Sequence, residues 1–131
     1  MTRLTITTAL ILAALSFGAV PAQAGDAAAG EKVFNKCKAC HQVGDKAKNR
    51  VGPVLNGIVG RPAGAAEGFK YSNALSGSGL TWNEATLAAF LADPKATVPG
   101  NKMAFPGLRK DEDIANVIAF LASYNADGTR K

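Results

Sequence analysis

Apolar positions recur at helical spacing in three segments of the chain, residues 24–42, 81–94 and 110–128. The apolar faces consist of Val33, Phe34, Cys37, Cys40 and His41 in the first segment, Leu87, Phe90 and Leu91 in the second, and Ile114, Val117, Ile118 and Leu121 in the third. The pattern therefore predicts three helices of ordinary length.

Local signals predict where two of these helices begin and end. Thr81 precedes Glu84 by three residues, which is the spacing of a capping box, and Pro94 stops the same helix. Three acidic residues at 111–113 suit the first turn of the last helix, and Gly128 follows its end.

The stretch between the first and second predicted helices is rich in glycine and shows no alternation typical of a strand. Seven glycines lie between Gly44 and Leu80, at positions 52, 57, 60, 64, 68, 77 and 79. A loop this long in a compact domain is expected to wrap around something. We predict an all-α fold with three main helices, up to two short helices and a long loop.

The first residues have the pattern of a secretory signal. A basic start is followed by an apolar run from Ala9 to Val20 and by Ala22-Gln23-Ala24. The run has 12 residues, fewer than the roughly 20 needed to span a bilayer. The sequence predicts cleavage of residues 1–24 and export of one domain, residues 25–131.

Charge is unevenly distributed along the chain, whose formal net charge is +5. Residues 32–61 contain seven basic residues and one acidic residue, whereas residues 62–131 contain seven of each. A basic domain can indicate nucleic-acid binding. Export and the scattered lysines argue against that function.

Cys37, Cys40 and His41 are the only cysteines and the only histidine of the chain. A structural zinc site needs four ligands, and no second pair exists. A thioredoxin-like dithiol expects a neighbouring strand, and a lone disulfide leaves His41 unexplained. The spacing C-x-x-C-H favours covalent attachment of a c-type haem, with two thioethers to the porphyrin and the imidazole on the iron.

Met103 is the only methionine after the predicted signal, within "VPGNKMAFPGL". A lone methionine often fills a core. A loop bounded by proline and glycine is an unusual place for such a filler. Thioether ligation would raise the reduction potential and, with His41, give a six-coordinate iron suited to electron transfer.

Five stretches of the chain together resemble a class I c-type cytochrome. They are "GDAAAGEKVFNKCKACHQV", "VGPVLNGIVGRPAG", "GFKYSNAL", "LTWNEATLAAFLADPKATVPGNKMAFPGL" and "DIANVIAFLASY". The resemblance implies the class I cytochrome c fold around one covalently bound haem c. It also implies that Gly30 and Phe34 meet Phe120 and Leu121 where the terminal helices cross.

The resemblance also implies roles for residues around the haem. Pro53 would offer its carbonyl to the far ring nitrogen of His41. Arg61, Tyr71 and Trp82 would lie near the buried propionates and offset the cost of burying them.

Two positions depart from the family pattern. Asn101 stands where a threonine is common beside the ligand methionine, which puts its hydrogen bond to a propionate in doubt. Phe90 stands where the mitochondrial type has a tyrosine, so the hydrogen-bond network on that side cannot be carried over.

The function implied is that of a soluble periplasmic one-electron carrier, monomeric and not an enzyme, with no small-molecule substrate. Its partners would be membrane-bound donor and acceptor complexes, and a respiratory oxidase, a photosynthetic reaction centre or a dehydrogenase would all be compatible. They would dock at a lysine-rich haem edge, for which the candidates are Lys36, Lys38, Lys46, Lys48, Lys95 and Lys102.

Two other functional classes fit the sequence less well. A haem peroxidase needs an open iron position, which Met103 would fill. Ligand-binding cytochromes of the four-helix type carry the haem motif near the C-terminus, whereas here it lies near the predicted mature N-terminus.

Overall fold

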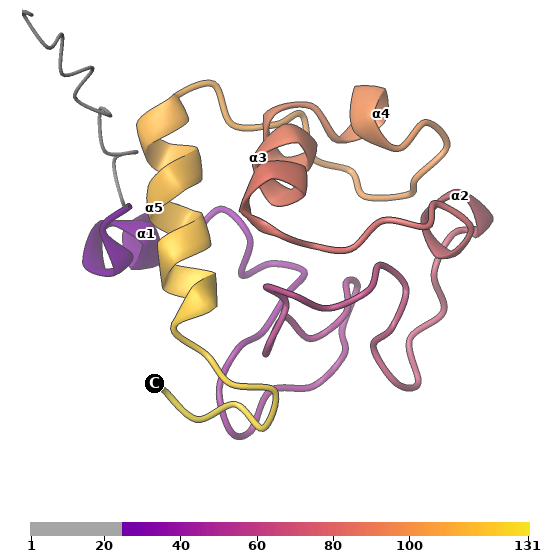
Figure 1. Cartoon of the computed structure of the whole chain (residues 1–131). Helices are drawn as coiled ribbons and strands as arrows, with labels where there is room; N and C mark the ends of the chain where they lie inside the picture. Colours follow the sequence, from indigo (N-terminus) through magenta and orange to yellow (C-terminus); the bar gives the residue numbers. More distant parts are fainter. Residues whose placement is uncertain (1–24) are drawn as a thin grey trace, which may run out of the picture.

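The computed structural model describes residues 25–131, so the predicted signal segment lies outside the described residues. Five helices appear in chain order (Figure 1): α1 (Ala27–Phe34), α2 (Asn73–Ser76), α3 (Glu84–Ala92), α4 (Pro94–Thr97) and α5 (Asp111–Ala122). Residues 25–131 form no strand and only two isolated bridges. The prediction of an all-α fold is confirmed, with α2 and α4 as the two short helices. Among these five helices, none has the length and apolar character needed to cross a membrane.

Helix α1 is shorter than the sequence pattern predicts. The side chain of Asp26 caps it by accepting hydrogen bonds from the backbone N–H groups of Ala28 and Ala29. After Phe34 the chain continues in turns, where the N–H of Cys37 donates to Phe34 at 2.8 Å and that of Cys40 donates to Cys37 at 3.1 Å. The prediction of one continuous helix to residue 42 is wrong, because these bonds join residues three apart rather than four.

Helix α3 begins at a different cap from the predicted one. Asn83 is the N-cap, and its side chain and that of Thr86 exchange reciprocal hydrogen bonds with each other's backbone N–H, both 2.9 Å. Thr81, predicted as the cap, instead pairs with Pro62 in an isolated bridge. Its carbonyl accepts a hydrogen bond from the Thr86 hydroxyl.

Proline 94 separates two helices. Helix α3 ends at Ala92, as the proline predicts, and Pro94 itself occupies the first turn of α4. Asp93 lies between them and caps α4 through the N–H of Ala96.

Helix α5 begins with three acids in its first turn, as predicted, and ends at Ala122, earlier than predicted. The chain then folds into a turn in which Tyr124 pairs with Arg130. Gly128 belongs to this turn, with φ of 86°, and does not cap the helix.

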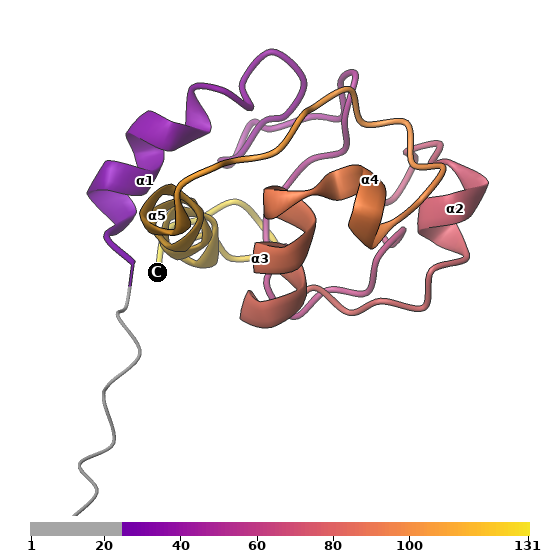
Figure 2. The same ribbon diagram turned by 90° about the horizontal axis from the view of Figure 1, so that it is seen from above.

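The crossing of α1 and α5 is the largest contact between helices (Figure 2). Gly30 has no side chain to hold the helices apart, and a Cβ atom there would overlap the carbonyl of Asn116. The rings of Phe34 and Phe120 lie 5.1 Å apart, and Asn116 accepts a hydrogen bond from the backbone N–H of Asp26 at 2.8 Å. Helix α3 packs against α5 as well, so that the apolar core lies among the three longer helices.

Candidate functional site

The Cys37–His41 motif lies in the turns that follow α1. Both cysteines are free and half-buried, and the backbone N–H of His41 donates to the carbonyl of Cys37 at 2.9 Å. Cys37 packs against the apolar core. Burial raises the pKa of its thiol, and neighbouring Cys40 raises this pKa further. The turns after α1 therefore place Cys37 at the edge of the core, with Cys40 and His41 close to it along the chain.

The imidazole of His41 is oriented by the loop that follows. Its Nδ1 lies 2.8 Å from the carbonyl oxygen of Pro53. A carbonyl can only accept, so Nδ1 carries the proton and Nε2 keeps its lone pair. Burial lowers the pKa of His41, which favours the neutral ring. A neutral imidazole with a fixed tautomer is prepared to bind a metal through Nε2.

Gly52 packs directly against the His41 ring, where a Cβ atom would overlap it. The N–H of Gly52 donates to the carbonyl of Cys40 at 2.9 Å, which fixes the loop to the motif. Gly52 is not among the site residues that the sequence predicts. The only sequence feature that could have indicated a role for Gly52 is its place directly before Pro53, and the stretch contains many other glycines.

Arg61 is tied to the same loop. Its Nη1 donates to the carbonyl of Asn56 and its Nη2 to that of Val54, both at 3.1 Å. Its Nε is buried and has no hydrogen-bond partner. Burial lowers the pKa of the guanidinium, against an opposing effect of Tyr71. A buried N–H donor without an acceptor fits an anionic group of a cofactor, because an orphaned donor is costly.

Trp82 and Tyr71 are both near Arg61. The backbone N–H of Trp82 donates to Arg61 at 2.9 Å, and its buried ring lies 4.9 Å from that of Phe90. The hydroxyl of Tyr71 accepts a hydrogen bond from the N–H of Ala66 at 2.9 Å and keeps its own proton available to donate.

Met103 is half-buried against the core, in the irregular segment between α4 and α5. Asn101 shapes this segment. Its Oδ1 accepts from the N–H of Met103 at 2.9 Å, and its Nδ2 donates to the carbonyls of Pro94 and Val98 at 2.8 and 2.9 Å. Both N–H groups of the amide are thus used within the protein, which leaves Asn101 no donor for a propionate.

The six lysines proposed for docking are all exposed: Lys36, Lys38, Lys46, Lys48, Lys95 and Lys102. The first two lie beside the cysteines in sequence, the next two in the loop after His41, and the last beside Met103. Exposed ammonium groups of this kind can steer an acidic surface toward the motif.

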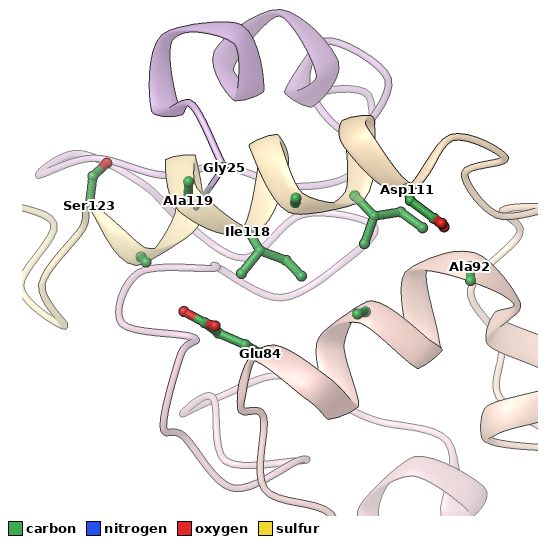
Figure 3. Close-up of a pocket in the computed structure, with 11 residues that line it drawn as sticks. Gly25, Glu84, Ala92, Asp111, Ile118, Ala119 and Ser123 are labelled. Atoms are coloured by element: carbon green, nitrogen blue, oxygen red, sulfur yellow. The ribbon is translucent and has the colours of Figure 1, made fainter. Parts of the chain in front are cut away.

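Residues 25–131 offer no group of three or more His, Cys, Asp and Glu that could hold a metal ion, so the zinc interpretation has no support there. A separate groove runs between α3 and α5 (Figure 3), lined largely by alanines, with Glu84 and Asp111 among its polar residues. It contains none of the predicted site residues. The chemistry of the described chain is therefore concentrated around His41.

A c-type haem fits this arrangement. The motif offers two thiols for thioethers, and the chain offers one imidazole and one thioether as iron ligands. The unpartnered Nε of Arg61 offers a buried donor for a propionate. These are the donor types that the cofactor requires.

Comparison with known proteins gives a consistent result. The sequence profile of the Cytochrome c family matches residues 27–125. The chain is 54% identical over 124 residues to cytochrome c-554 of Methylosinus trichosporium, covering 92% of this chain and 94% of the relative. It is 56% identical over 115 residues to cytochrome c2 of Rhodomicrobium vannielii, covering 88% and 92%.

The solved structure of cytochrome cH from Methylobacterium extorquens superimposes with a TM-score of 0.70 at 54% identity, covering 74% of this chain and 97% of that one. The fold is therefore that of a class I cytochrome c. With the profile match spanning most of the described residues, the chain belongs to the cytochrome c family.

Proposed function

We propose that this protein is a soluble periplasmic one-electron carrier that shuttles electrons between membrane-bound redox complexes. As a cytochrome c it carries one covalently attached haem c and transfers electrons. The observation that carries the proposal is the C-x-x-C-H motif, whose histidine ring is held by the Pro53 carbonyl at 2.8 Å. Bound haem supplies an iron that alternates between the ferrous and ferric states.

Four side chains are proposed to hold the haem and its iron. Cys37 and Cys40 would form the thioethers, and His41 and Met103 would ligate the iron. The Nδ1–H of His41 donates to Pro53, which fixes the ring and increases the basicity of Nε2. Gly52 leaves room for this ring orientation.

Three further residues are proposed to bind the propionates. Arg61 offers its buried Nε, and Tyr71 and Trp82 offer a hydroxyl and an indole N–H. Hydrogen bonds from such donors offset the cost of burying carboxylates. The hydrogen bonds of Arg61 to Val54 and Asn56 hold its guanidinium in place for this contact.

The absence of an enzymatic role is part of the proposal. The relatives include proteins named cytochrome c2 and cytochrome c-550. A methionine ligand on the iron would leave no open position for peroxide or another small substrate. An electron carrier needs only an accessible haem edge and an iron whose ligands stay bound in both redox states.

Export and partner docking complete the proposal. The basic and apolar pattern of residues 1–24 supports a cleaved signal peptide and a periplasmic protein of residues 25–131. The monomer would meet acidic surfaces of its partners through the exposed lysines beside the motif and beside Met103.

Two measurements on the purified protein test the haem assignment. We expect an intact mass equal to the chain from Gly25 plus one haem, with haem retained after extraction by acidified acetone. The ferric protein should show the weak sulfur-to-iron charge-transfer band of methionine ligation. Isolation of a haem-free protein with a Cys37–Cys40 disulfide would refute the proposal.

A further inference from the structure

The segment that carries Pro53, residues 52–56, is hydrogen-bonded at every residue. The partners are Cys40 and Arg50 for Gly52, His41 for Pro53, Asn49 and Arg61 for Val54, Gln42 and Ile58 for Leu55, and Gly44 and Arg61 for Asn56. Four of these partners, Cys40, His41, Gln42 and Gly44, belong to residues 40–44, which run beside the segment. The position of the Pro53 carbonyl therefore depends on how these two segments are held together.

Asn56 joins the two segments through two side-chain hydrogen bonds. Its side chain is buried, with an exposed fraction of 7%. Its Oδ1 accepts from the N–H of Gly44 at 2.9 Å, while its Nδ2 donates to the carbonyl of Gly44 at 2.8 Å. One amide thus pairs with both backbone groups of a single residue, three positions after His41.

The turn after α5, residues 124–130, packs against both sides of this link. Gly128 is buried against the carbonyl of Gly44, where a Cβ atom would overlap that carbonyl. Ala126 contacts the position of Gly57, directly after Asn56. Figure 1 shows the same relationship, with the yellow end of the chain beside the violet loop.

The turn has its own internal structure. The N–H of Asn125 donates to Thr129 at 2.8 Å, and the N–H of Gly128 donates to Asn125 at 3.0 Å. The guanidinium of Arg130 lies over the Tyr124 ring, 4.8 Å from its centroid, and donates to the Tyr124 hydroxyl at 3.0 Å. A turn closed in this way presents Gly128 in a fixed place.

We propose that the turn at residues 124–130 is a positioning element for the axial histidine. By packing against Gly44 and Gly57, the turn preserves the two hydrogen bonds between Asn56 and Gly44. These bonds in turn hold the Pro53 carbonyl within hydrogen-bonding distance of the Nδ1–H of His41. This inference rests on the proposed role of His41 as an iron ligand. Its consequence is that residues more than eighty positions after His41 help to set the basicity of its imidazole.

Two variants test the contact in different ways. Gly128→Ala adds a Cβ atom against Gly44, and a chain that ends at Asn125 removes the contact without any overlap. Gly79→Ala is the matched control, because Gly79 also has a positive φ, 69°, but is exposed with open space around it. The control carries the same kind of backbone strain without touching the loop.

The measurement is hydrogen exchange in the reduced holoprotein, followed by NMR. We expect the His41 Nδ1–H to exchange at least about tenfold faster in Gly128→Ala and in the shortened chain, because its hydrogen bond to Pro53 would open locally more often. The backbone N–H of Val117, in the α1–α5 core, reports global unfolding and should change by less than about twofold. Gly79→Ala should leave both rates as in the unaltered protein.

Two results would overturn the inference. One is an unchanged exchange rate of the His41 proton in both altered chains. The other is an equal acceleration at His41 and Val117, which would mean that the turn contributes only to global stability. Failure of the proposed function looks different, because the His41 ring protons of the unaltered protein would then lack the large shifts caused by a haem ring current.

Discussion

The side-chain oxygen of Asn101 accepts a hydrogen bond from the backbone N–H of Met103 at 2.9 Å. The amide nitrogen of the same asparagine donates to Pro94 and Val98, in and just after α4. A single side chain thus fixes the proposed methionine ligand relative to a helix end. A threonine at this position could not make all three bonds, because a hydroxyl has only one proton to donate.

We expect Asn101→Ala to weaken methionine ligation. The variant removes the acceptor of the Met103 N–H and one of the two donors to each of the carbonyls of Pro94 and Val98, which costs on the order of 1–3 kcal/mol of loop stability. The ferric sulfur-to-iron band should therefore disappear at a lower pH than in the unaltered protein, as another ligand replaces the thioether. A spectroscopic pH titration measures this midpoint.

Asn73→Ala provides the control, since Asn73 is an exposed asparagine in the first turn of α2. Its titration should match that of the unaltered protein. An unchanged midpoint in Asn101→Ala would show that the Met103 segment does not depend on this amide.

We expect Met103→Ala to keep the haem attached and to free the sixth coordination position. Loss of a soft ligand disfavours the ferrous state, so the midpoint potential should fall. The ferric variant should bind cyanide and acquire some peroxidase activity. The measurements belong near neutral pH. A spectrum and potential like those of the unaltered protein would mean that Met103 only packs.

We expect Gly30→Ala to destabilise the protein although alanine favours a helix. In an isolated helix the change would stabilise by about 1 kcal/mol. Here the added Cβ would overlap the Asn116 carbonyl at the α1–α5 crossing, and overpacking of this kind costs about 1–3 kcal/mol. Guanidinium unfolding of the holoprotein, followed by circular dichroism, gives the difference in free energy.

Ala28→Gly serves as the reference for Gly30→Ala, because Ala28 is exposed on the same helix and its loss should cost about 1 kcal/mol or less. A Gly30→Ala protein as stable as the unaltered one would contradict close packing at the crossing.

We expect the rate of electron transfer to a membrane partner to fall as ionic strength rises. At about 0.15 M salt the screening length is about 8 Å, so at higher salt concentrations the exposed lysines largely lose their ability to steer a partner. The double variant Lys36→Glu, Lys102→Glu should show a shallower dependence. Stopped-flow kinetics over a range of salt concentrations measures the slope.

A second double variant, Lys110→Glu with Lys131→Glu, makes the same change in net charge away from the motif in sequence. It should keep the steep salt dependence. If both double variants showed the same slope of rate against salt concentration, the effect would belong to net charge. If the rate of the unaltered protein did not depend on salt, the docking proposal would be refuted.

The start of α5 was predicted well because two independent signals agree there, although the helix ends earlier than its pattern predicts. Its apolar face and the acids of its first turn both mark the same helix. At α1 the pattern misled, since Cys37 and Cys40 continue the apolar face although the backbone has already changed to turns. Side-chain spacing alone cannot distinguish bonds between residues three apart from those four apart.

The start of α3 shows a different limit. Thr81 with Glu84 and Asn83 with Thr86 both have the spacing of a capping box. The structure uses the second pair, because Thr81 is engaged by Pro62, far away in the sequence. The close contact of Gly52 with the His41 ring could not be predicted from the sequence either, because a glycine in a sequence does not indicate which residue it contacts.

The joining of α1 to α5 has a consequence for how the chain matures. Asp26 and Asn116, which share a hydrogen bond across that crossing, are 90 residues apart in sequence. Closing so long a stretch carries a large entropic cost, and contacts of this range form late and slowly. An emerging polypeptide therefore stays open until α5 is free to dock. During that interval we expect the thiols of Cys37 and Cys40 to be more accessible to haem than in the folded protein, where both are half-buried.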